Sequence, residues 1–531
     1  MNTSTEIGMR LFAPRLRQAA IPVALYAPLF LIGAVVLWTL LSAISHSAPD
    51  KDNIEELVWA SSFEWGYFKH PPVPSWILYP LVLLFGKSVW LTFFAGQSVC
   101  ALGLWLLWKF GCEFTTPRRS LIAMLMVSVT AYFSIRADMY NHNSVQMWSI
   151  VASTWLYYRA LRYQHARDWL WLGAACGVAF LTKYSALIQF AAFFVFFVYA
   201  GHWRDRRAWR GAAMALAVFL LVISPHIHWL IHHHFGPLHY ADTSIFPTSG
   251  GSFSESHQIA EFLSTQLGRL SPMLVAWLAV AYWQFRASRR SSTPKILVAT
   301  RPYARALSAW DRSFLVIVGG SPVLLTVTVS AFIEAHLGAS WATTFFVLFG
   351  FYTFWWLGGD EREVLRRTAI TVMTIQILMA AGYAIGRGPL AYHTGMETNS
   401  TYPGSIISRR MRAIWHQYVP TAPLTLVAAH TWLGGNIAIH MHPSPEILED
   451  GKPELSPWIK SHNPLRCGAL IAMSSVDYPS GATNEVLNRL YEEAPYKGVI
   501  RQRWSAPTSP LITIRWAVIP PTTSCTRYAS F

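Results

Sequence analysis

The sequence predicts an α-helical protein that crosses a membrane many times and ends in an α/β domain outside it. Hydrophobic residues make up 53% of the 531 residues and charged residues only 13%, about half the charged share of an average soluble domain. The mean hydropathy is +0.30, and the 25 tryptophans are typical of a chain anchored at membrane interfaces. From Gly386 onward the apolar runs become too short to span a bilayer, which predicts a separate domain.

Eleven apolar segments follow one another before that point, and about 20 apolar residues are needed to cross a bilayer. The first segment follows Arg10, Arg15 and Arg17, is too long for a signal-peptide core and lacks a small-residue cleavage site, so we expect an uncleaved signal anchor. The segments between 119 and 201 are short, so their bounds can shift by several residues. The expected spans are 21–44, 89–110, 119–134, 144–160, 168–182, 185–201, 211–230, 260–284, 314–333, 341–357 and 368–386.

The basic residues of the loops predict the orientation. Eleven spans that start from a cytoplasmic N-terminus leave the C-terminus outside, and Lys and Arg gather in the loops that this arrangement places in the cytoplasm. Such short basic loops also account for the net charge of +15 without a nucleic-acid partner, because they form no continuous groove. The loops expected outside hold few basic residues before the tail, namely Lys51, Lys69, Lys87, Arg136 and Lys183.

We therefore expect two domains. Residues 1–386 form the transmembrane domain, and residues 387–531 form a soluble α/β domain, suggested by a helix near 406–418 and short apolar runs at 424–429 and 467–473. Cys467 and Cys525 can pair there if the compartment is oxidising. The segment 73–84 is apolar but short and begins with proline, so we expect a helix along the outer membrane face. The external loops expected to carry the chemistry are 45–88, 135–143, 231–259 and 334–341.

The first external loop holds a group of carboxylates. In a helix that begins at residue 52, Asp52, Glu55 and Glu56 fall at positions i, i+3 and i+4 and share one face. A carboxylate at a helix N-terminus both caps the helix and stays ionised. Two interpretations are open: a helix cap with a solvated acidic face, or a general base at the membrane surface provided by Asp52.

The same loop resembles a known family. From Asp52 to Pro72 it reads D-x6-W-x6-G-Y-F-x-H-P-P, which is similar to the first external loop of ArnT-like and protein-O-mannosyltransferase-like glycosyltransferases of the GT-C class, families of the 39/83 type. The resemblance covers nearly the whole chain, because further family elements follow in order. These are Gly177–Tyr184, Ser224–Trp229, Pro237–Ala241, Tyr402–Gly404 and Trp432–Asn436.

The resemblance implies a function. Such enzymes take a sugar from a polyprenyl-phosphate carrier and pass it to an envelope acceptor, which can be lipid A or another glycolipid, a polysaccharide or a protein. They work at the periplasmic face of the bacterial inner membrane. The family pattern places Asp52 in the active site as base or orienting carboxylate. Many members have Asp-Glu where this chain has Asn53, and a second acidic position falls in the next external loop, where either Asp138 or Asn141 fills it.

The expected site combines carboxylates with cations. Asp52 and Asp138 are the expected catalytic residues. Displacing a lipid phosphate from an anomeric carbon needs cations beside the leaving phosphate, and Lys69 in the Lys-His-Pro-Pro turn is best placed; each cation can instead be a residue that reaches to the interface. The expected substrate-binding residues are Lys69, His70, Glu55, Arg136, Asn141, Lys183, Tyr184 and His336.

A metal site and a transport function are the alternatives to this interpretation. A group of histidines, His226, His228 and His232–His234, suggests a metal, but a spacing of two on a helix does not place two rings on one face. Lys and Arg can neutralise a monophosphate, so we expect that no metal or other cofactor is required. The alternative function is a transporter or flippase for an anionic lipid or solute, which would carry ionisable residues at mid-membrane depth. The nearly uncharged spans favour surface chemistry.

Overall fold

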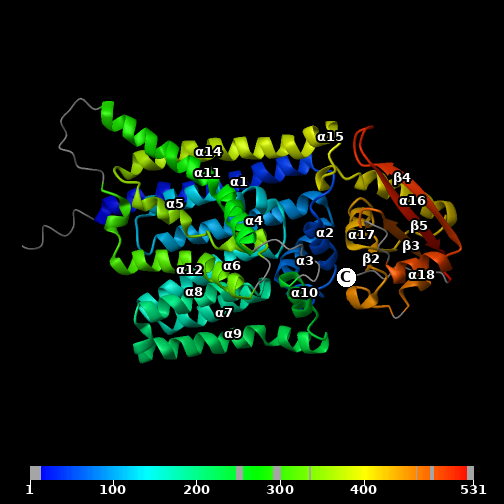
Figure 1. Cartoon of the computed structure of the whole chain (residues 1–531), viewed down its shortest axis with the longest axis horizontal. Coiled ribbons are helices and arrows are strands. Elements are labelled where there is room, and N and C mark those ends of the chain that lie inside the picture. The colour runs from blue at the N-terminus through cyan, green and yellow to red at the C-terminus, as the bar shows by residue number, and fades with distance from the viewer. Residues whose placement is uncertain are drawn as a thin grey trace, which may run out of the picture.

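Long helices lie side by side in one bundle, and a small sheet domain stands at one end of it (Figure 1). The structure is a computed structural model that describes residues 13–246, 255–290, 301–333, 337–461, 463–478 and 484–522. The bundle helices are α1 (Ala13–Ser45), α4 (Val89–Gly111), α5 (Pro117–Ser128), α6 (His142–Tyr163), α7 (Ala166–Thr182), α8 (Ala186–Tyr199), α9 (Arg206–His232), α11 (Glu255–Arg290), α12 (Ala309–Ile333) and α14 (Glu361–Ile385).

Within the described residues, five helices are long and apolar enough to cross a membrane: 24–45 of α1, α4, α9, 309–332 of α12, and the run 361–393 that begins with α14. The pair formed by α5 and residues 131–138 is a sixth candidate, bent by 87°. The chain is a multi-pass membrane protein, as predicted, and the number of eleven spans stays a prediction. α6 falls outside the five because its sequence contains many polar residues, and several of these are buried among the other helices.

Two expected spans differ from straight helices. The span expected at 119–134 is broken after α5, where the chain bends into the 3₁₀ turns Ala131–Phe133 and Ile135–Asp138. The span expected at 341–357 is wrong as a single helix, because the chain there forms the 3₁₀ turn Ala339–Thr344, the short helix α13 (Phe349–Tyr352) and the 3₁₀ turn Thr353–Trp355. The segment 341–357 is mostly buried, and irregular backbone is tolerated at membrane depth when protein surrounds it.

Short helices cross the end of the bundle that faces the sheet domain (Figure 1). They are α2 (Lys51–Trp59), α3 (Val73–Phe85) and α10 (Gly236–Ile245). α3 corresponds to the helix expected along the outer membrane face, and Leu83, Leu84 and Phe85 at its end are exposed. These helices lie between the membrane part and the C-terminal part, so residues from both parts can meet there.

The C-terminal part is an α/β domain, as predicted. Its five-stranded sheet has the order β2-β1-β3-β5-β4, in which β2, β1 and β3 are parallel and β5 and β4 antiparallel. The strands are β1 (Leu426–Ala429), β2 (Glu446–Glu449), β3 (Ala469–Ser474), β4 (Tyr496–Arg503) and β5 (Leu511–Ile519). Its helices are α16 (Gly404–Tyr418), α17 (Thr431–Ile439) and α18 (Glu485–Glu493), and the short α15 (Ala391–His393) ends the run 361–393 before them.

Alternation along the strands builds two cores. Val427 and Ala429 of β1 belong to a core with Trp415 of α16, whereas Leu426 and Ala428 point to the opposite face and pack with α18, as the two-residue period of a strand requires. The first core continues through α17 to α2, so one apolar cluster joins the two parts of the chain.

The contact between α17 and α2 is close. A Cβ atom on Gly435 of α17 would overlap Ile54 of α2, so only glycine fits at this position. The predicted domain division at residue 386 stays a prediction. Cys467 forms a disulfide, and its expected partner Cys525 lies outside the described residues.

Candidate active site

Asp52 lies at the start of α2 and does not cap it. The helix begins at Lys51, one residue earlier than expected, and its N-cap is Asp50. Asp50 accepts a hydrogen bond from Asn399 (2.8 Å) and lies 3.6 Å from Arg387. The Asp52 side chain is partly exposed and accepts a hydrogen bond from Asn141 Nδ2 at 2.8 Å. The carboxylate is therefore free of the capping role and is available at the surface of the site.

Asn53 holds the second external loop against α2. Its side chain is fully buried, donates to the backbone oxygen of Asp138 (2.8 Å) and accepts from the backbone N–H of Tyr140 (3.1 Å). A carboxylate in its place could not donate the first of these bonds. Asn53 stands at the position where many members of the family named above have an acidic residue. In this chain its side chain instead fixes the second external loop to α2.

The structure brings Asn141, and not the Asp138 carboxylate, to Asp52. Asn141 is the N-cap of α6: its Oδ1 accepts from the backbone N–H groups of Asn143 and Ser144, which leaves Nδ2 for Asp52. The Asp138 side chain is buried, and its two oxygens accept from Ser42 and Gln97. Of the two alternatives for the second position, Asn141 is the one in contact with Asp52, and Asp138 is engaged in helix packing.

Lys69 pairs with Glu55 one turn beyond Asp52. The two side chains form a hydrogen-bonded ion pair in which the Lys69 side chain keeps 26% and the Glu55 side chain 14% of its exposure. Burial raises the pKa of Glu55, and Lys69 opposes this rise. Although burial acts to lower it, the pKa of Lys69 is raised because the Glu55 carboxylate stabilises the ammonium form. Lys69 stays charged, and two of its three N–H donors remain for a substrate anion.

Lys183 approaches Asp52 from the end of α7. Its ammonium donates to the side-chain oxygen of Asn143, two residues after the Asn141 that contacts Asp52. Burial lowers the pKa of Lys183 to about 8, and the charge of Asp52 opposes this change. Next to it, the Tyr184 hydroxyl lies 2.8 Å from Nε2 of His226, whose Nδ1 donates to the Trp65 carbonyl. This chain of bonds connects α7, α9 and the first external loop.

Behind these residues is a buried His–Glu group. His142 Nδ1 lies 3.2 Å from Glu56 Oε1, and the rings of His142 and His70 are 3.9 Å apart. Burial raises the pKa of Glu56 well above its usual range, and burial together with His142 and the nearby lysines lowers that of His70. Both shifts favour uncharged forms. His70 thus supports the site from inside, and Glu56 is not part of a solvated acidic face.

Arg136 and His336 are the remaining residues that the sequence predicts to bind substrate. Arg136 donates to Ser340 Oγ at 2.7 Å and is near enough to Asp52 for an electrostatic interaction. His336 lies outside the described residues. In the described part of the chain, no group of three or more His, Cys, Asp or Glu side chains could hold a metal ion, and His228 and His232 only contact each other's rings.

The sheet domain contributes residues that the sequence did not point to. Glu449, at the end of β2, is buried and accepts from Thr431 and from Trp59 Nε1 of α2, the latter at 3.3 Å. Burial raises the pKa of Glu449 to about 7. His430 follows β1 and is near enough to Glu55 for an electrostatic interaction. Some 390 positions separate Trp59 from Glu449, so no spacing pattern signals this contact.

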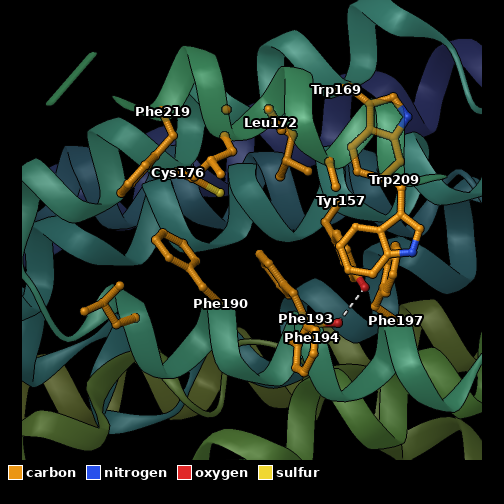
Figure 2. Close-up of a pocket in the computed structure, with 15 residues that line it drawn as sticks. Tyr157, Trp169, Leu172, Cys176, Phe190, Phe193, Phe194, Phe197, Trp209 and Phe219 are labelled. Atoms are coloured by element: carbon orange, nitrogen blue, oxygen red, sulfur yellow. Dashed lines mark hydrogen bonds between the residues drawn. The ribbon is translucent and has the colours of Figure 1, made fainter. Parts of the chain in front are cut away.

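An apolar pocket of about 400 Å³, partly open at the surface of the bundle, lies between α7, α8 and α9, away from these charged residues. Figure 2 shows it between Phe190, Phe193 and Phe194 of α8 on one side and Leu172, Cys176 and Phe219 of α7 and α9 on the other. The Tyr157 hydroxyl donates to the Phe193 carbonyl at 2.6 Å beside it. Such a lining suits a hydrocarbon chain and cannot hold a sugar phosphate.

The sequence is similar to one family model and to two known proteins of Rhizobium johnstonii. Residues 69–229 match the family model "Dolichyl-phosphate-mannose-protein mannosyltransferase". The chain is 22% identical to the lipopolysaccharide core galacturonosyltransferase RgtA of Rhizobium johnstonii, over 80% of this chain and 82% of the relative. It is also 22% identical to the lipid A galacturonosyltransferase RgtD of the same organism, over 60% and 63%.

The fold is similar to that of ArnT from Cupriavidus metallidurans bound to undecaprenyl phosphate. The TM-score is 0.61 at 14% sequence identity, and the match covers 92% of this chain and 98% of the other. The apo state of the same protein gives a TM-score of 0.60. The fold implied by the resemblance is confirmed.

Proposed function

We propose that this chain is an ArnT-like glycosyltransferase of the GT-C class and that it moves a sugar from a polyprenyl-phosphate carrier to a glycolipid of the cell envelope. The observation that carries the proposal is the partly exposed Asp52 carboxylate at one end of the bundle, with Lys183 near it and Lys69 paired with Glu55 one turn further along α2. Two cations and one available carboxylate are what the transfer requires.

The proposed reaction uses each group once. Lys69 and Lys183 bind the phosphate of the carrier, and Asn141 orients Asp52. The oxygen of the acceptor hydroxyl forms a bond to the anomeric carbon of the sugar, and Asp52 takes the proton of that hydroxyl. The bond from that carbon to the phosphate oxygen breaks, and its electron pair leaves with the phosphate, whose added charge the two lysines neutralise. We propose that no metal takes part, because these cations suffice for a monophosphate.

The relatives support the two substrate classes. The similar ArnT structure contains undecaprenyl phosphate, and the curated relatives act on the lipopolysaccharide core and on lipid A. We therefore propose a polyprenyl-phosphate donor and a lipopolysaccharide acceptor. The alternative of a transporter or flippase is less favoured, since the matching proteins whose names state an activity are all transferases.

Mass spectrometry of envelope glycolipids tests this function. A strain that lacks the gene should lose a glycolipid species heavier than its precursor by one sugar residue, and the mass difference identifies the sugar. The wild-type gene should restore the species, and the Asp52→Asn variant should not. Identical glycolipid profiles with and without the gene would contradict the proposed function.

We further propose that the protein resides in the inner membrane with its N-terminus in the cytoplasm and the sheet domain in the periplasm. Reporter fusions at residues 205, 245, 290 and 450 should then read inside, outside, inside and outside, because basic loops stay in the cytoplasm. An inside signal at residue 450 would overturn this orientation and, with it, periplasmic chemistry.

A further inference from the structure

The parallel strands of the sheet domain end beside α2, the helix that carries Asp52 and Glu55. Ala429 of β1 is the register partner of Glu449 of β2, and the Glu449 side chain touches Trp59 of α2. In open α/β sheets, ligands bind at the carboxyl ends of the strands. Figure 1 shows β2 and α17 on the side of the domain that faces α2 and α3. The edge at which such sheets bind ligands is therefore turned toward Asp52 and Lys69.

His430 lies at this edge of the sheet. Its side chain is accessible to a ligand and is next to the buried carboxylate of Asp477. His430 follows β1 directly, and its side chain keeps 35% of its exposure. Its Nδ1 lies 3.4 Å from Oδ1 of Asp477, whose side chain is fully buried. Among the described residues, neither oxygen of Asp477 has a hydrogen bond. A buried carboxylate with no other compensation favours a protonated imidazole beside it.

His430 Nδ1 faces two groups at 3.4 Å: the backbone N–H of Trp432, from which it accepts a hydrogen bond as the N-cap of α17, and the Asp477 carboxylate. When Nδ1 is protonated, it gives up the first contact and donates to Asp477. The other groups around the ring are carboxylates and Tyr478. The edge of the Tyr478 ring meets the imidazole at 5.9 Å between ring centroids, and the Tyr478 hydroxyl donates to Asp450 at 3.0 Å. Although burial acts to lower it, the pKa of His430 is raised because of Asp477 and the further carboxylates nearby. The charged groups that face it are Asp477, Asp450 and Glu449 from the strand ends and Glu55 from α2.

The combination of several carboxylates with few cations around His430 suits a saccharide ligand better than an anionic one. Several carboxylates surround one imidazolium and Lys69, so a second negative charge would be repelled. A sugar carries vicinal hydroxyls that donate to carboxylates and ring or hydroxyl oxygens that accept from N–H groups, so it can satisfy both kinds of partner. Glu55 lies on the α2 face that also carries Asp52, so a saccharide held here has a path to the reacting carboxylate.

We propose that His430, held by Asp477, binds the saccharide of the acceptor at the seam between α2 and the sheet domain. This inference rests on the proposed function and adds an acceptor subsite contributed by the C-terminal part. His430 donates from Nε2–H to a sugar oxygen, and Asp477 is a positioning residue that fixes the ring and its charge. The donor phosphate, bound by Lys69 and Lys183, is separate from this subsite.

Steady-state kinetics of the full-length protein in detergent or liposomes test the subsite. The probes are a polyprenyl-phosphate sugar as donor and purified lipopolysaccharide precursor as acceptor. His430→Ala should raise the KM for the acceptor about tenfold or more, because a hydrogen bond from a charged donor is lost, while the KM for the donor stays within about twofold. His430→Gln, which keeps an N–H donor, should recover part of the loss.

The pH profile supplies a second readout. In the wild type, the KM for the acceptor should rise with increasing pH as the His430 imidazolium loses its proton, above the usual range of histidine, and this dependence should vanish in His430→Gln. His165→Gln is the matched control, since His165 lies 3.5 Å from Asp168 in a second His–Asp pair at the opposite end of the bundle. That variant should leave both KM values unchanged.

The outcomes separate the two proposals. Absence of transfer by the wild type with every donor and acceptor tried would reject the proposed function itself. Transfer by the wild type with an unchanged acceptor KM in His430→Ala, or a change in the donor KM alone, would overturn the acceptor subsite. A lower melting temperature with unchanged kinetics would assign His430 a structural role only and would overturn it as well.

Discussion

Asp52→Asn should fold, insert and bind donor, yet transfer the sugar at least about a hundredfold more slowly than the wild type. An acceptor hydroxyl is a poor nucleophile until its proton is removed, and a positioned base contributes about 10²–10⁴-fold. The substitution removes the base and little else. Asn141 Nδ2 can donate to the amide oxygen of the variant as it donates to the carboxylate, and α2 keeps its N-cap, Asp50. Donor turnover measured at saturating acceptor checks the rate.

Two further variants sharpen this result. Asp52→Glu should recover little, because the longer side chain displaces the oxygen by about 1 Å, and such a displacement can cost about 10²-fold. Asp50→Asn is the control for a lost charge at the same helix end: it removes the ion pair with Arg387 and should lower stability without the rate defect. Near-normal transfer by Asp52→Asn would remove Asp52 from the catalytic set and direct attention to Asp138.

The chemistry of the acceptor distinguishes a base from an orienting group. A hydroxyl acceptor needs a base, so Asp52→Asn removes both the base and the orienting carboxylate. An acceptor that is itself an ionised phosphate needs no base, so the same variant then impairs only substrate orientation.

The sequence predicted the membrane fold because hydropathy is a local property. A helix that faces lipid can be predicted from the apolar run in its own sequence, and the α/β part begins where these runs stop. The prediction failed at 341–357, where the segment is apolar because protein surrounds it and not because lipid does. It also missed the bend after α5, since no hydropathy pattern distinguishes a straight span from a broken one.

Within the candidate site, the sequence indicated the residues of the external loops but not how they pair. It left Asp138 and Asn141 as alternatives, and only the packing of Asp138 against Ser42 and Gln97 separates them. No local sequence pattern marked Glu449 or His430 as site residues. Their positions beside the site depend on how β1 and β2 pair in the sheet. Contacts between distant segments depend on how sheets and helices dock, which local patterns do not encode.

Lys69→Ala should weaken donor binding and slow transfer together. A charge-assisted contact to the carrier phosphate is worth about 1.5–3 kcal/mol, which corresponds to a loss of roughly ten- to 150-fold in kcat/KM. Lys69→Arg should keep part of the activity, since the charge remains but the geometry of the donors changes. Kinetics with varied donor concentration measure both effects.

The pairing of Lys69 with Glu55 requires a second comparison, because removing the lysine also leaves a buried carboxylate without its partner. The double variant Lys69→Ala with Glu55→Gln removes both charges, so any defect caused only by the unpaired Glu55 should disappear, whereas a lost phosphate contact should persist. Lys87→Ala is the matched control in the same external loop, where the lysine donates to Ser61 at 2.7 Å; it should transfer normally. Unchanged transfer by Lys69→Ala at normal protein level would assign the phosphate to Arg136, Lys183 or His336, and full activity of the double variant would show that Lys69 serves only to neutralise Glu55.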